Sequence, residues 1–127
     1  MAEKIKKGDV VWFFAGYDGK ATMAVYKYGI KSAGAKQGTA VQETDGKFIE
    51  SRIYAENYKN MVPVADMPDP APYAMELAAA YKADNIKRNV DAVTWYACGS
   101  GAPDGYFAAM KKDCAEIMEA APKVVFK

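Results

Sequence analysis

The stretch Gly8-Asp9-Val10-Val11-Trp12-Phe13-Phe14 is the densest apolar run of the 127-residue chain. Side chains alternate between the two faces of a strand, and in this run both alternate sets are apolar. We therefore expect a buried first strand that is covered on both faces. A small barrel on one face and packed helices on the other would provide that cover.

Two Asp-Gly pairs divide the residues that follow into strands. An Asp-Gly pair between apolar runs favours a two-residue hairpin turn, and such pairs stand at Asp18-Gly19 and Asp45-Gly46. The sequence predicts further strands over residues 21–32, 39–43, 48–54 and 61–64, with an irregular or 3₁₀ turn over residues 55–60. In the second strand, Gly29 is expected to allow a bend.

Four strands, a single turn and a fifth strand, opened by Gly-Asp-x-Val-Trp and an early Asp-Gly, resemble an SH3-like barrel of the KOW, Tudor or PWWP kind. The resemblance covers residues 8–64 and implies a five-stranded β-barrel. The PWWP tetrapeptide itself is absent, and no functional residue is carried over from the resemblance.

The second half of the chain has the composition of helices. Asp69 suits a helix cap and Pro70 a first helical position, so a helix is expected from there to about Ala97. One expected buried stripe runs along the whole helix and consists of Met75, Ala79, Ile86, Val90, Val93 and Ala97. A second lies opposite it in the first half only and consists of Tyr73, Leu77, Ala80 and Tyr81. A second helix follows Asp104-Gly105. Its expected stripe consists of Phe107, Met110, Cys114, Ile117 and Ala121, and residues 123–127 are expected to add a short strand.

These elements predict an α+β protein in which an N-terminal SH3-like five-stranded β-barrel is packed against a C-terminal helical hairpin. Residues 1–66 would form the barrel part and residues 67–127 the helical part. The length and the 51% hydrophobic content suit one compact domain over residues 1–127.

The chain has no histidine, and this excludes several kinds of catalytic site together. Serine and cysteine hydrolase triads, His-ligated zinc and His general-base chemistry all need that side chain. Cys98 and Cys114 cannot complete a four-thiolate site and are expected to be reduced core thiols. The Gly-rich segment 99–105 lacks the Lys-Ser/Thr pair of a P-loop, so it is interpreted as an ordinary turn. We therefore expect neither a cofactor, nor a metal, nor enzymatic activity.

The charge balance and the hydropathy of the chain limit the kinds of partner and the location that we expect. The 17 basic residues nearly balance the 16 acidic ones, so no global field favours a polyanion or a membrane surface. No segment approaches the length of a membrane span, and the basic start lacks the apolar segment of a signal peptide. The expected location is the cytoplasm.

A mixed basic and aromatic face on the barrel is the first candidate binding site. It would be built from Lys27, Lys31, Lys36, Phe48, Arg52 and Tyr54, since alternation turns Ile49 and Ile53 inward. Aromatic platforms beside cations can hold single-stranded nucleic acid. Against that interpretation, Glu50 lies on the same strand, and residues 1–62 hold 10 basic and 7 acidic residues. A solvated face is the alternative.

Trp95 is the second candidate, because it projects from the helix on the side that carries Asp84, Arg88 and Asp91. A tryptophan on a polar face suits an interface anchor. Cover by a loop or by the C-terminal tail would make it a core residue instead, and both interpretations stay open.

The expected function is therefore non-enzymatic binding of another protein by an accessory or inhibitor module that occludes its partner's surface. Compact proteins of this sort are common among phage and mobile-element products, which makes such an origin an expectation from base rates. The alternative is a nucleic-acid-binding module that uses the basic and aromatic face. An enzyme with carboxylate chemistry ranks third, since the sequence displays no paired carboxylates.

Overall fold

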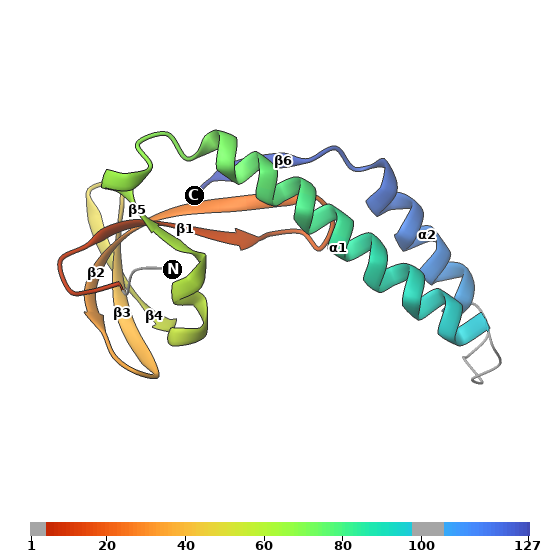
Figure 1. The fold of residues 1–127 in the computed structure, drawn as a ribbon, viewed down its shortest axis with the longest axis horizontal. Helices are drawn as coiled ribbons and strands as arrows, with labels where there is room; N and C mark the ends of the chain where they lie inside the picture. The colour runs from red at the N-terminus through yellow and green to blue at the C-terminus, as the bar shows by residue number, and fades with distance from the viewer. Residues whose placement is uncertain (1–4, 98–105) are drawn as a thin grey trace. The chain divides into compact units, whose positions relative to one another are not determined.

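The computed structural model describes the backbone of residues 5–97 and 106–127 and the side chains of residues 5–91 and 109–127. The chain divides into two units. The first comprises residues 1–15, 24–72 and 126–127 and holds most of a sheet, whereas the second comprises residues 16–23 and 73–125 and holds two helices (Figure 1). The α+β class is confirmed, and a single compact domain over residues 1–127 stays a prediction.

Five strands follow one another along the first part of the chain. They are β1 (Val10–Gly16), β2 (Thr22–Ala33), β3 (Gln37–Thr44), β4 (Lys47–Tyr54) and β5 (Met61–Pro63), with the 3₁₀ turns η1 (Ala55–Asn60) and η2 (Val64–Asp66) on either side of β5. Their order in the sheet is β4-β3-β2-β1-β5. The β3–β4 and β1–β5 pairs are antiparallel. The predicted strands and the predicted 3₁₀ turn are thus confirmed.

The sheet is open rather than closed into a barrel. Closure would require its two end strands to pair, but within the described residues β4 and β5 stand at opposite ends of the order. A sixth strand, β6 (Lys123–Phe126), pairs with β2. The N–H groups of Lys123 and Lys127 donate to the carbonyls of Ala21 and Val25, so the two strands advance in the same direction. The short C-terminal strand is confirmed, and the SH3-like resemblance stays a prediction.

The two Asp-Gly pairs form different turns. Between β3 and β4, Thr44 pairs with Lys47, and Asp45 and Gly46 have φ values of +52° and +76°, as a two-residue hairpin turn requires. Between β1 and β2 the Tyr17 N–H donates to the Thr22 carbonyl, which leaves four residues, 18–21, in the loop. The first hairpin is confirmed, but its two-residue turn is wrong.

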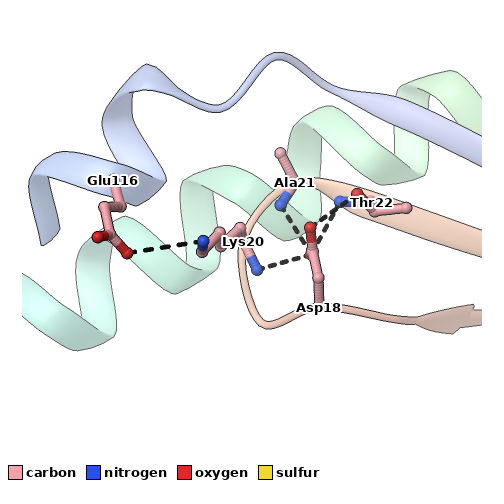
Figure 2. Close-up of polar contacts among 5 residues, drawn as sticks. All are labelled: Asp18, Lys20, Ala21, Thr22 and Glu116. Carbon is pink, nitrogen blue, oxygen red and sulfur yellow. Dashed lines mark hydrogen bonds and ion pairs between the residues drawn. The ribbon is translucent and has the colours of Figure 1, made fainter. Parts of the chain in front are cut away.

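The Asp18 carboxylate explains the longer loop (Figure 2). Its Oδ1 accepts hydrogen bonds from the backbone N–H groups of Lys20, Ala21 and Thr22 at 2.8, 3.2 and 3.1 Å, and its Oδ2 accepts from the Thr22 hydroxyl at 2.7 Å. An Asp side chain that accepts from nearby backbone N–H groups stabilises a local turn of its own. Burial alone would raise the pKa of Asp18, but the hydrogen bonds from Thr22, Lys20 and Ala21 outweigh it and hold that pKa below its ordinary value.

The apolar first strand is covered less completely than the sequence predicts. Val11 and Phe14 are buried, but Val10 is 46% exposed. The core of the first unit lies on the Val11 side of the sheet and consists of Ile5, Val11, Ile30, Ala40, Ile53 and Met61. Ile53 faces inward as expected, whereas Ile49 is 51% exposed, because it lies near the β3–β4 turn and outside that cluster.

Two helices follow, α1 (Ala71–Ala97) and α2 (Tyr106–Glu119), both within the predicted spans. The Ala71 N–H donates to Asp69 Oδ1 at 3.2 Å, which confirms the predicted cap. In α2, Ile117 is buried and Met110 and Cys114 are half-buried, as the predicted stripe requires. Ala121 lies beyond the end of α2 and is exposed, and the side chain of Phe107 lies outside the described residues.

The predicted stripe along the whole length of α1 is wrong in its described part, whereas Leu77 and Tyr81 of the second predicted stripe are half-buried. Met75 and Val90 are each 45% exposed, whereas Ala74 and Ala78 are fully buried. Ala79 is exposed and Ile86 half-buried, and the side chains of Val93 and Ala97 lie outside the described residues.

Polar side chains explain the difference, because α1 contacts the tip of the first hairpin through them. Tyr81 Oη accepts from the Gly19 N–H at 2.7 Å, and the Asn85 side chain donates to the Lys20 carbonyl at 3.1 Å. The Tyr81 ring lies so close to Gly16 that a Cβ there would stand 2.3 Å from it. The packing face of α1 therefore contains Tyr81, which belongs to the second predicted stripe, and Asn85, a polar residue that a search for apolar periodicity passes over.

Candidate binding face

One face of strands β2, β3 and β4 carries most of the predicted binding residues. Gly29 pairs with Val41, which pairs with Glu50, so these three residues share a face. Alternation adds every second residue along each strand. We call this surface the Phe48 face. It includes Lys27, Gly29, Lys31, Val41, Glu43, Phe48, Glu50, Arg52 and Tyr54, and Val10 of β1 lies beside them.

Two of its cations already have partners within the chain. Lys31 Nζ forms an ion pair and hydrogen bond with Glu50 Oε1. Lys27 Nζ lies 5.7 Å from the centroid of the Trp12 ring, within the range of a cation–π contact. Both lysines are exposed, as expected. Glu50 nevertheless neutralises part of the charge of Lys31, and Lys27 already contacts an aromatic ring. Both contacts lower the attraction of the face for a polyanion.

A hollow of about 620 Å³ lies on this face near the β3–β4 turn. Its residues include Val10, Gly29 and Val41, with Phe48 and Lys27 also in its lining. Phe48 is 73% exposed and Val10 46% exposed, and both are large apolar side chains. Since Gly29 contributes no side chain, the sheet surface is depressed between its neighbours. An apolar side chain of a partner would find apolar walls here.

The lining of the hollow carries charges of both signs. Glu43 and Asp45 belong to it, together with Lys27 and Lys127. The Gln42 side-chain amide donates to the Lys127 carbonyl at 2.8 Å, which holds the C-terminal residue beside β3. Carboxylates at this position oppose a phosphate backbone but suit the mixed surface of a protein.

Arg52 and Tyr54 lie at the other end of β4. Tyr54 is 49% exposed and pairs with Gln37, whose neighbour Lys36 is also exposed. The Lys36 carbonyl accepts a hydrogen bond from the Ala55 N–H, which fixes the backbone of the β2–β3 turn beside the end of β4. Arg52 forms no ion pair with any described residue. This end of the face is basic and aromatic, as the sequence predicts.

Trp95 belongs to α1, but its side chain lies outside the described residues, as does Cys98. The interface and core interpretations of Trp95 therefore both stay predictions. Cys114 is a half-buried free thiol in α2.

The residues that the sequence analysis missed are those that shape the hollow. Val10 was assigned to a covered face and Gly29 to a bend, whereas the register shift falls between Ile30 and Ser32. Gly29 itself pairs regularly with Val41. A glycine between two lysines on one strand face was the available signal, since it leaves a gap in a row of side chains.

Among the described residues no group of His, Cys, Asp and Glu side chains is arranged to hold a metal ion. Over the same residues, neither helix has a stretch long and apolar enough to cross a membrane. Comparison of the chain with protein-family models, with curated proteins and with solved structures finds no match.

Proposed function

We propose that this chain is a non-enzymatic protein-binding module, an accessory or inhibitor protein that occludes a surface of its partner. The hollow on the Phe48 face would take an apolar side chain of that partner, and the surrounding residues would supply polar contacts. An SH3-like architecture and a cytoplasmic location belong to the same proposal.

The observation that carries the proposal is the exposure of Phe48 and Val10 beside the hollow floored by Gly29 and Val41. Large apolar side chains that cluster beside a depression are typical of protein interaction sites. The carboxylates of Glu43 and Asp45 in the same lining favour a protein over a nucleic acid as the occupant.

Substitutions of Gly29 test this proposal without disturbing the sheet. A Cβ at Gly29 would have the Val41 carbonyl oxygen at 3.7 Å as its nearest neighbour, an ordinary van der Waals contact. Gly29→Val should therefore fold, because valine favours strands, and its branched side chain should fill part of the hollow. Gly29→Ala is the matched control with a smaller side chain.

The measurement is affinity capture from the native host, read by mass spectrometry, with wild type and both variants side by side. A partner of the hollow should be captured by wild type and Gly29→Ala and lost with Gly29→Val. The purified partner should then bind wild type with little dependence on salt, as an apolar contact predicts. Equal capture by all three proteins would rule out the hollow as the binding site.

The alternative function is nucleic-acid binding, and the exposed Tyr54 beside Arg52 and Lys36 favours it. The variant Lys27→Glu/Lys31→Glu/Arg52→Glu should keep its fold, since all three side chains are exposed. If nucleic acid is the ligand, that variant should lose most of its affinity, and the remaining binding should have a smaller salt slope. Unchanged affinity for the best RNA or DNA ligand would remove this alternative.

A further inference from the structure

Residues 48–54 of β4 have a chemically symmetric sequence, Phe-Ile-Glu-Ser-Arg-Ile-Tyr. Around Ser51, each charged, aliphatic and aromatic residue has its counterpart at equal distance on the other side. We propose that two copies of this chain pair through β4 in antiparallel orientation, with a two-fold axis at Ser51, so that their sheets become continuous. This proposal goes beyond the proposed function and does not depend on it.

The position of β4 makes such pairing available. β4 ends the sheet order and has only β3 beside it among the described residues. Its register with β3 runs without a shift through eight consecutive pairs. Natural sheets usually protect a terminal strand by shortening it, by a proline or a bulge, or by charged side chains. β4 is not shortened and has neither proline nor bulge. Its charges Glu50 and Arg52 are of opposite sign, so they need not repel a second β4 strand, and its backbone offers a long template.

The hydrogen-bonding pattern shows which groups face the open edge. The Ala55 N–H donates to the Lys36 carbonyl, which places an odd-numbered residue in a bonded pair with the β2–β3 side. Bonding alternates along an antiparallel ladder. The odd-numbered residues of β4 therefore bond to β3, and the N–H and C=O groups of the even-numbered residues point toward the open edge of the sheet. These edge-facing residues are Phe48, Glu50, Arg52 and Tyr54.

Pairing centred on Ser51 brings the edge-facing residues of one copy opposite the edge-facing residues of the other. Phe48 then lies opposite Tyr54 of the second copy, and Glu50 opposite Arg52 of the second copy. A shift by one residue would set backbone groups that face the open edge opposite groups that already bond to β3, so no ladder would form. A shift that centres the pair on Glu50 or on Arg52 would set like charges against each other. Of these registers, the Ser51-centred one satisfies the backbone and the charges together, and registers centred beyond Glu50 or Arg52 would keep less of β4 paired.

The exposed side chains support a second copy as the occupant. Arg52 has no ion-pair partner among the described residues, and Glu50 would gain it in addition to Lys31. Both aromatic residues of β4, Phe48 and Tyr54, are exposed and would become cross-strand neighbours. A foreign peptide would need no such symmetry in β4, whereas a second copy requires it. Tyr54 of the second copy would also stand beside the Phe48 wall of the hollow.

Sedimentation velocity of the purified full chain over a concentration series tests the proposal. Wild type should show a concentration-dependent dimer. Arg52→Glu and Glu50→Arg should each weaken it by about tenfold or more, because each sets like charges opposite each other. Lys59→Glu, an exposed charge change in η1, is the matched control and should leave the dimer unchanged. Circular dichroism confirms that each variant folds.

Ser51→Cys tests the register itself. Facing residues of a non-hydrogen-bonded antiparallel pair have Cα atoms about 4.5 Å apart, within the range of about 4.4–6.8 Å that a disulfide needs. Mild oxidation should link two copies of this variant faster than two copies of Ser32→Cys, an exposed control on β2. It should also link them faster than wild type, a control for links through Cys98 and Cys114.

Two outcomes would overturn the proposal. The first is a wild-type protein that stays monomeric at every concentration at which it remains folded. The second is a Ser51→Cys variant that links no faster than the controls. Because no other protein is present in these measurements, they can fail while partner binding at the hollow succeeds, and Gly29→Val should leave the dimer intact.

Discussion

The two hairpins of the sheet contain the same Asp-Gly dipeptide and differ in almost everything else. Asp18 accepts four hydrogen bonds from its own loop, and residues of α1 and α2 contact that loop. Asp45 instead takes a left-handed backbone conformation, and its carboxylate receives no hydrogen bond from the described residues. The first hairpin is thus held by side-chain contacts, whereas the second turn has no such contact from Asp45 among the described residues, and its strand β4 ends the sheet.

The largest expected effect distinguishes the two aspartates. Asp18→Ala removes an acceptor of four hydrogen bonds and should lower the free energy of unfolding by about 2–4 kcal/mol. Asp45→Ala removes none of these bonds and should cost only about 1 kcal/mol, from the left-handed conformation that alanine disfavours. Urea denaturation of both variants measures the difference. Equal losses would show that the two turns are stabilised in the same way.

The pH dependence of Asp18 sharpens the comparison. Because its folded pKa lies below its ordinary value, the ionised side chain stabilises the fold above the unfolded pKa of about 3.9, and this contribution is lost as pH falls through the lower folded pKa. Asp18→Asn keeps one acceptor oxygen and has no such titration. The stability difference between wild type and Asp18→Asn should be constant near neutral pH and shrink in acid. A difference that grows in acid would contradict the assigned cause.

A smaller effect is expected from two tyrosine hydroxyls. Tyr81→Phe removes the acceptor of the Gly19 N–H and should cost about 1 kcal/mol. Tyr54→Phe is the matched change on β4, where no hydrogen bond of that hydroxyl is formed with a described residue, and should change stability by less than about 0.5 kcal/mol. Thermal melts of the two variants provide the comparison.

The smallest effect is expected at the most exposed aromatic residue. Phe48→Ala should change the free energy of unfolding by less than about 0.5 kcal/mol, because the side chain is 73% exposed. A loss above 2 kcal/mol, measured at a concentration where the chain is monomeric, would show that Phe48 is held by the fold and would contradict its assignment to a binding face.

Much of the local structure could be predicted from the sequence. Alternation identified the shared face of Phe48, Arg52 and Tyr54, and the Asp69 cap identified the start of α1. The buried face of α1 was predicted only in part: Tyr81 belongs to the second predicted stripe, whereas Asn85, which also contacts the hairpin tip, is polar and leaves no apolar period. The hollow was missed because its signal was the absence of a side chain at Gly29, between Lys27 and Lys31, rather than the presence of one.

The element types, their approximate bounds and the side of each strand on which a residue lies follow from the sequence alone, since these depend on neighbouring residues and on backbone geometry. Tertiary structure decided that the sheet stays open, that β6 pairs with β2, and that β4 ends the sheet. Those outcomes depend on which distant segments pair, and backbone N–H and C=O groups are the same in every strand, so local sequence does not identify their partners.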